Sequence, residues 1–146
     1  MAQHTETLRD ITTLQDRIIQ MIAAKPPDDS WVEIVVSFEV EGEDGGETTD
    51  YTIFAVCKSA SGFHKLALFF EIDEEDLFLE LRRLYRALND TWSTVDVRLL
   101  RDGRFTFDFE YGPPKCLNGD MDAIRRFDTY LDGYEQKHLN DLESAE

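Results

Sequence analysis

Apolar residues recur along this chain with two different spacings, and the spacings predict its helices and strands. From about Thr5 to Ala24 they fall at helical spacing, and Pro26 and Pro27 end that helix. From Trp31 to Val40 the period changes to two, which is typical of a strand with one buried face and one polar face. The helical stripe consists of Leu8, Ile11, Leu14, Ile18 and Ile22.

The pattern of apolar residues in the middle of the chain predicts two more strands and a second helix. The segment Thr49 to Lys58 has a mixed apolar pattern, which indicates an inner strand covered on both sides, and Phe63 to Ile72 follows as a third strand. Asp73 is the expected cap of the second helix. Its apolar stripe is Leu77, Leu81, Leu84, Tyr85 and Leu88.

A hairpin from Ser93 to Tyr111 is the clearest local feature. Two alternating strands flank Arg101-Asp102-Gly103. A two-residue Asp102-Gly103 turn would pair core-facing with solvent-facing positions. A three-residue loop with glycine in the left-handed conformation instead pairs Leu99 with Phe105, and we expect that register. It pairs Val97 with Phe107 and Val95 with Phe109 on one face, and Arg98 with Thr106, Asp96 with Asp108 and Thr94 with Glu110 on the other.

A last helix is expected from about Asp120 toward Asn140, with a possible kink or early end at Gly133. Its expected core-facing residues are Met121, Ile124, Phe127, Leu131, Tyr134 and His138. The fold class is then α+β, in the order α-β-β-β-α-β-β-α, with a five-stranded antiparallel sheet and helices mainly on one face. The other face should be partly wet. Residues 1–146 form one domain, with frayed ends at 1–4 and about 141–146.

The net charge of the chain limits the classes of molecule that we expect it to bind. The 146 residues carry 15 Lys and Arg against 31 Asp and Glu, a net formal charge of −16. Nine acids and no basic residue lie between Pro26 and Cys57. A field of this sign repels nucleic acid and anionic membranes and attracts basic proteins. We therefore expect a basic protein partner, with no direct nucleic-acid binding and no membrane association.

The N-terminus and the cysteines indicate a cytoplasmic protein. The first residues, Met1 to Glu6, lack the basic start and apolar core of a signal peptide. Cys57 and Cys116 have no disulfide-framework spacing, so two reduced, inert thiols are expected.

Catalytic and metal-binding motifs are not found in the sequence. His4, His64 and His138 have no metal-ligand spacing, and the acidic loop from Glu41 to Asp50 lacks the pattern of an EF-hand. No cofactor is expected. We expect Trp92 to pack over the hydrophobic core as a lid. The opposed Asp96 and Asp108 leave open an enzyme using paired carboxylates, but a binding protein is the preferred interpretation.

The hairpin resembles the YezG-like family of bacterial antitoxin or immunity proteins of polymorphic toxin systems. The resemblance rests on Trp92-Ser93-Thr94-Val95-Asp96-Val97-Arg98-Leu99-Leu100 and on Asp102-Gly103-Arg104-Phe105-Thr106-Phe107-Asp108-Phe109-Glu110-Tyr111. It extends more loosely over most of the chain. Gly112-Pro113-Pro114-Lys115 departs from the acidic run expected after Tyr111.

The resemblance implies a monomer or homodimer that binds and neutralises a cognate secreted, nuclease-type toxin. A carboxylate-rich surface suits the basic groove of a nuclease. The expected partner-binding residues are Glu41, Glu43, Asp44, Glu47, Asp50, Asp96, Asp108 and Glu110. An alternative from another class is an acidic secretion chaperone, which would hold an effector segment as a dimer; the shared element order keeps this alternative open.

Overall fold

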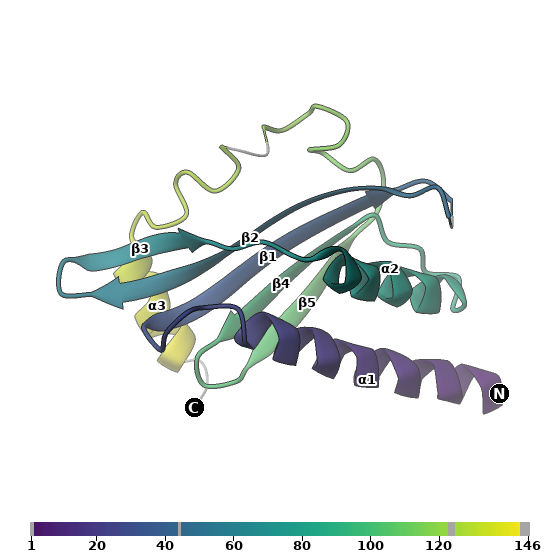
Figure 1. Cartoon of the computed structure of the whole chain (residues 1–146), viewed down its shortest axis with the longest axis horizontal. Coiled ribbons are helices and arrows are strands. Elements are labelled where there is room, and N and C mark those ends of the chain that lie inside the picture. Colours follow the sequence, from purple (N-terminus) through teal and green to yellow (C-terminus); the bar gives the residue numbers. More distant parts are fainter. Residues whose placement is uncertain (1, 44, 123–124, 144–146) are drawn as a thin grey trace.

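A five-stranded antiparallel sheet in the order β3-β2-β1-β4-β5 forms the centre of the protein (Figure 1). The computed structural model describes residues 2–43, 45–122 and 125–143. The strands are β1 (Trp31–Glu41), β2 (Thr48–Ser59), β3 (Gly62–Ala67), β4 (Thr94–Leu100) and β5 (Phe105–Glu110), and the helices are α1 (Ala2–Ala23), α2 (Ile72–Arg86) and α3 (Tyr134–Glu143). The element order and the α+β class predicted from the sequence are confirmed.

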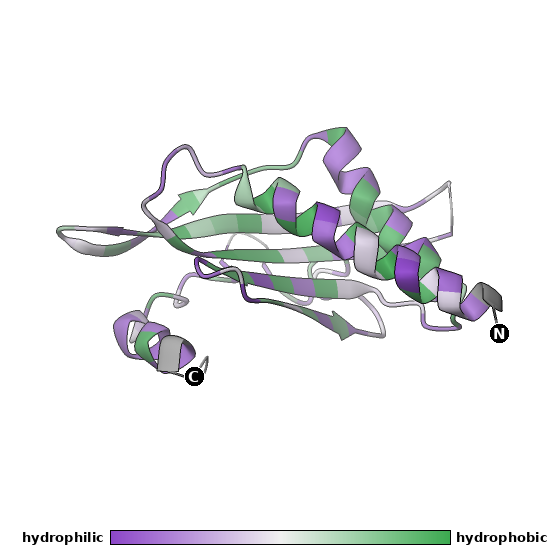
Figure 2. Cartoon of the chain, turned by 90° about the horizontal axis from the view of Figure 1, so that it is seen from below, coloured by the Kyte–Doolittle hydropathy of each residue, from purple (hydrophilic) through white to green (hydrophobic). Residues whose placement is uncertain are grey.

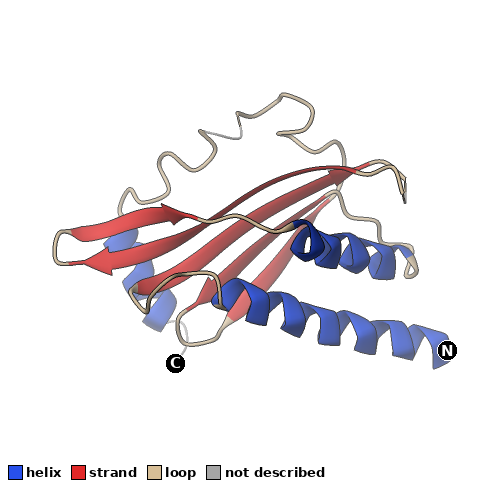
Figure 3. Cartoon of the chain, viewed as in Figure 1, coloured by secondary structure: helices blue, strands red, loops and turns tan. Residues whose placement is uncertain are grey.

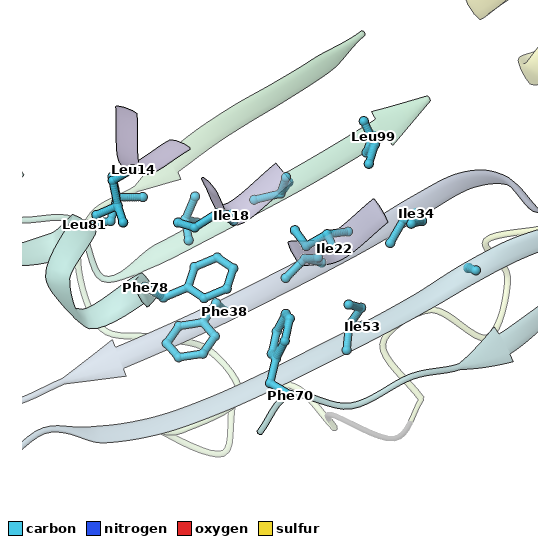
Figure 4. Packing of buried hydrophobic residues seen from close by; sticks show 14 of the residues in the cluster. Leu14, Ile18, Ile22, Ile34, Phe38, Ile53, Phe70, Phe78, Leu81 and Leu99 are labelled. Carbon is cyan, nitrogen blue, oxygen red and sulfur yellow. The ribbon is translucent and has the colours of Figure 1, made fainter. Parts of the chain in front are cut away.

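The first face of the sheet is covered by α1 and α2 (Figure 3). Their apolar stripes meet the inward side chains of β1, where Phe38 stacks on Phe78 with 4.6 Å between ring centroids. Figure 4 shows Ile18 and Ile22 of α1 reaching the same core. Phe78 is fully buried although it lies outside the predicted stripe. Trp92 is also fully buried, as its reading as a core lid requires.

The hairpin register is confirmed. Leu99 pairs with Phe105, Val97 with Phe107, and Asp96 with Asp108. The Leu100 amide donates to the Arg104 carbonyl at 2.8 Å and closes a loop in which Gly103 has φ 97°. Only glycine adopts this left-handed conformation without strain, so the position of Gly103 sets the register of the two strands.

The second face differs from the prediction of a partly wet surface. In Figure 2 the sheet lies between the α1–α2 pair and α3, so the last helix is on the opposite side. Residues 112–122 and 125–143, here called the C-terminal strap, cover this face. Consequently Glu33, Ser37 and Glu39, polar side chains that β1 places on this face, are 0%, 0% and 1% exposed. The alternating pattern of β1 identified the two faces correctly, but both are buried.

The last helix is present but begins later than predicted, and the interruption expected at Gly133 is confirmed. Residues 125–133 form successive turns, with hydrogen bonds from the amides of Asp128 and Tyr130 to the carbonyls of Arg125 and Phe127, and helix begins only at Tyr134. Gly133 has φ 66°, a conformation that interrupts a helix. Tyr134 and His138 lie against Phe63 on the second face rather than on the main core, and Ile124 lies outside the described residues.

The other boundaries shift by a few residues. Strand β3 ends at Ala67, not at Ile72, and Glu71 takes the cap position predicted for Asp73. There the Glu71 amide donates to the Glu74 carboxylate at 2.7 Å, one half of a capping box. Within the described residues, no helix combines the length and apolar character needed to cross a bilayer.

Candidate functional site: the acidic second face of the sheet

Strand pairing gathers four of the eight predicted acidic residues into two neighbouring rows on the second face. One row runs across the sheet through Asp50, Glu39, Thr94 and Glu110, and the next through Thr52, Ser37, Asp96 and Asp108. Two groups that are far apart in the sequence, the β1–β2 hairpin and the last hairpin, therefore contribute to one surface. We call these two rows the acidic rows.

Arg126 from the C-terminal strap lies over the middle of the acidic rows. Its guanidinium is 3.2 Å from the Glu39 carboxylate and 3.6 Å from Asp96. The Glu39 carboxylate also accepts hydrogen bonds from the Cys116 and Leu117 amides at 3.0 and 2.9 Å. Glu39, at 1% exposed, is thus a buried and fully partnered group that anchors the strap.

A second anchor lies three rows from Glu39 on the same face of β1. The buried Glu33 carboxylate pairs with Arg98 and accepts hydrogen bonds from the hydroxyls of Tyr130 and Tyr134 at 2.8 and 3.1 Å. Arg98 also pairs with Asp141 of α3 at 2.6 Å. Burial and the nearby Glu33 charge both raise the pKa of each tyrosine above its ordinary value. The two anchors hold the strap in place and leave the β5 end of the acidic rows uncovered.

The β5 end of the acidic rows carries two exposed carboxylates. Asp108 and Glu110 are exposed, and within the part of the chain that the structure describes neither has an ion-pair partner. Asp96 is half-buried instead of exposed. Burial, together with the charges of Glu110 and Asp108, raises the pKa of Asp96, while Arg126 opposes the shift. The carboxylates available to a partner at this end are therefore Asp108 and Glu110.

The β1–β2 end is less uniform than the sequence suggested. Glu41 and Glu43 are exposed, Asp50 is half-buried, and Asp44 lies outside the described residues. Glu47 is not available: its side chain is 5% exposed, pairs with Arg83 at 3.2 Å and accepts the Gly45 amide at 2.8 Å. This carboxylate ties the hairpin to α2.

Glu39, Asp50 and Cys116 bring ligand atoms within 4.8 Å of one another. The donor set does not suit a cation, because both Glu39 oxygens already accept amides and one also faces the Arg126 guanidinium. Burial and the neighbouring Glu39 raise the pKa of the Cys116 thiol, which disfavours the thiolate that binds metals. Both cysteines are unbridged, as expected.

The sequence analysis did not find the roles of Glu33, Glu39, Arg126 and Tyr130, and it placed Tyr134 on the core without its hydrogen bond to Glu33. The available signal was the set of polar residues at alternate positions of β1 together with the aromatic run in the strap. A scan against models of protein families and a search of curated proteins found no match to this chain. The resemblance in the hairpin therefore rests on its residues alone.

Proposed function

We propose that this protein is an antitoxin or immunity protein that binds a cationic, nuclease-type toxin through the acidic rows and the exposed acids of the β1–β2 hairpin. The observation that supports this most is the placement of Asp108 and Glu110 at one end of a surface already rich in carboxylates, where both are exposed and neither has an ion-pair partner among the described residues. A net charge of −16 adds a long-range field that would accelerate association with a basic partner.

Arg126 already makes, within the chain, the type of contact that we propose for the toxin. One guanidinium of the chain itself contacts two carboxylates of the acidic rows. Arginine and carboxylate form charge-assisted contacts that are stronger than neutral hydrogen bonds. A toxin whose phosphate-binding groove presents arginines or lysines would offer the same chemistry to Asp108 and Glu110. Such an inhibitor would occupy or flank the groove and exclude nucleic acid from it.

The direct test is inhibition of the toxin encoded beside this protein's gene. We expect Asp108→Asn/Glu110→Gln to weaken inhibition by about tenfold or more, a typical cost for interfacial charges. Glu41→Gln/Glu43→Gln should weaken it if the hairpin also docks. The matched control is Asp10→Asn/Asp16→Asn on α1, which changes the net charge equally at two exposed positions. Equal loss of inhibition in the Asp108/Glu110 variant and the control would mean that net charge matters and the acidic rows do not.

A further inference from the structure

Two large apolar side chains lie on the surface where the chain enters α2. Ile72 is 80% exposed and Phe69 is 65% exposed, more than any other large apolar residue of the described chain. The adjacent Phe70 is 5% exposed and belongs to the main core (Figure 4). Phe69 and Ile72 therefore add little to folding, since most of their area stays in water.

A shallow groove of about 330 Å³ adjoins Phe69. It lies between the C-terminal end of α1 and the segment after β3, and its lining includes Met21, Ala24, Leu68 and Phe69. An apolar side chain from a partner could enter the groove while Phe69 and Ile72 contact the partner's surface. Exposed apolar patches with polar rims are characteristic of interaction sites.

Two exposed carboxylates lie beside Ile72 on α2. Asp76 follows Ile72 by one helical turn on the same side of α2, and Asp73 is next to Ile72 in the chain. Both are exposed, and among the described residues neither has an ion-pair partner. The one lysine lining the groove, Lys25, is 2.5 Å from the Glu74 carboxylate, so its charge is already compensated. We call Phe69, Ile72, Asp73 and Asp76 the Ile72 patch.

We propose that the Ile72 patch is a second docking surface, and that its occupant is a segment of a cationic protein carrying an apolar side chain flanked by lysine or arginine. Charge complementarity selects this occupant over a second copy of the chain. A two-fold symmetric dimer through the patch would bring Asp73 and Asp76 of one copy against the same residues of the other. The inference uses the proposed function only in taking the partner to be a cationic protein.

The patch and the acidic rows would have different roles in binding. Exposed charges mainly affect the association rate, whereas apolar anchors buried at the centre of an interface slow dissociation. The acidic rows contain no exposed apolar anchor of the size of Ile72 or Phe69. An anchor at the Ile72 patch would supply what the acidic rows lack.

The experiment uses a synthetic amphipathic peptide of leucine and lysine as the probe, with calorimetry for affinity and amide chemical shifts for location. We expect binding with the largest shifts between residues 69 and 76. Ile72→Ser should weaken the affinity about tenfold, and Asp73→Asn/Asp76→Asn should weaken it and reduce its salt dependence. Leu8→Ser is the matched control, because Leu8 is 47% exposed and lies roughly 22 Å along α1 from its C-terminal end.

The outcomes separate this inference from the proposed function. No binding, equal effects of Leu8→Ser and Ile72→Ser, or a dimer that Ile72→Ser dissociates would overturn the Ile72 patch as a docking surface. Loss of peptide binding in Asp108→Asn/Glu110→Gln, with none in Ile72→Ser, would assign the peptide to the acidic rows and also overturn it. Peptide binding at the patch together with failure to inhibit the toxin would overturn the proposed function and leave the Ile72 patch standing.

Discussion

Replacing Arg98 by methionine tests whether the strap covers the second face as described. The substitution keeps a long apolar stem and removes the cation that pairs with Glu33. Glu33 is 0% exposed, so its carboxylate would stay buried with only the two tyrosine hydroxyls as partners. Removing one member of a buried ion pair typically costs about 3–5 kcal/mol of unfolding free energy.

The Arg98 side chain is 40% exposed, so water can partly compensate the Glu33 charge after the substitution. We therefore expect a loss near the lower end of that range, about 3 kcal/mol. Glu33→Gln should cost less, about 1–2 kcal/mol, because it leaves Arg98 with Asp141 and access to water. The double variant should lose at least about 1 kcal/mol less than the sum of the two single losses, since the two groups interact directly.

Urea unfolding followed by circular dichroism gives these free energies. The control is Arg125→Met. Arg125 pairs with Asp122, and the two side chains are 80% and 57% exposed. Removing this exposed pair should change the unfolding free energy by no more than about 0.5 kcal/mol. A loss below about 1 kcal/mol in Arg98→Met, or additive losses in the double variant, would refute the buried Glu33–Arg98 pair and the placement of the strap.

Phe107→Ala should lose about 2 kcal/mol of unfolding free energy, which is below the usual range for a fully buried ring because Phe107 is half-buried. Asp108→Ala should be neutral or slightly stabilising, because it relieves the repulsion between Asp108 and Asp96. A larger loss in Asp108→Ala than in Phe107→Ala, measured by urea unfolding, would mean that the two faces of the hairpin are inverted. Because the folded protein raises the pKa of Tyr130 and Tyr134, the stability that they contribute is complete below the unfolded value near 10 and falls as pH rises above it. Tyr130→Phe/Tyr134→Phe should flatten that alkaline decline, and an unchanged pH profile would contradict the shift. Cys116 should react slowly with a thiol reagent at neutral pH and Cys57 should react only on unfolding, so rapid modification of either in the native protein would contradict their environments.

The order of helices and strands and the register of the hairpin could be predicted from the sequence, because both depend on local chemistry. Alternation in β4 and β5, with Gly103 between them, left one register that matched the core faces. The covering of the second face could not be found in this way. A period of two says which side chains share a face, but the partners of Glu33 are 65 to 101 residues away in the sequence.

The strap was misread for a related reason. Phe127, Leu131, Tyr134 and His138 have spacings that suit a helix, yet the same spacings allow successive turns to place aromatic rings along the sheet. Gly133 and the long-range contacts of Arg126 and Tyr130 decide in favour of turns. For the candidate site, the sequence identified the acids themselves, while strand pairing decides which of them share a surface and which, like Glu47, are already occupied.

The most direct measurement of the central claim is the association rate of this protein with the toxin that the proposed function requires, determined by stopped-flow at low and high salt. If the acidic rows attract a cationic partner, association is fast at low salt and slows markedly as salt rises past physiological levels. Asp108→Asn/Glu110→Gln should then slow association at low salt and show a weaker salt dependence, while Asp10→Asn/Asp16→Asn stays close to the unmodified protein. An association rate that is independent of salt and equal in all three proteins would contradict the proposed role of the acidic rows.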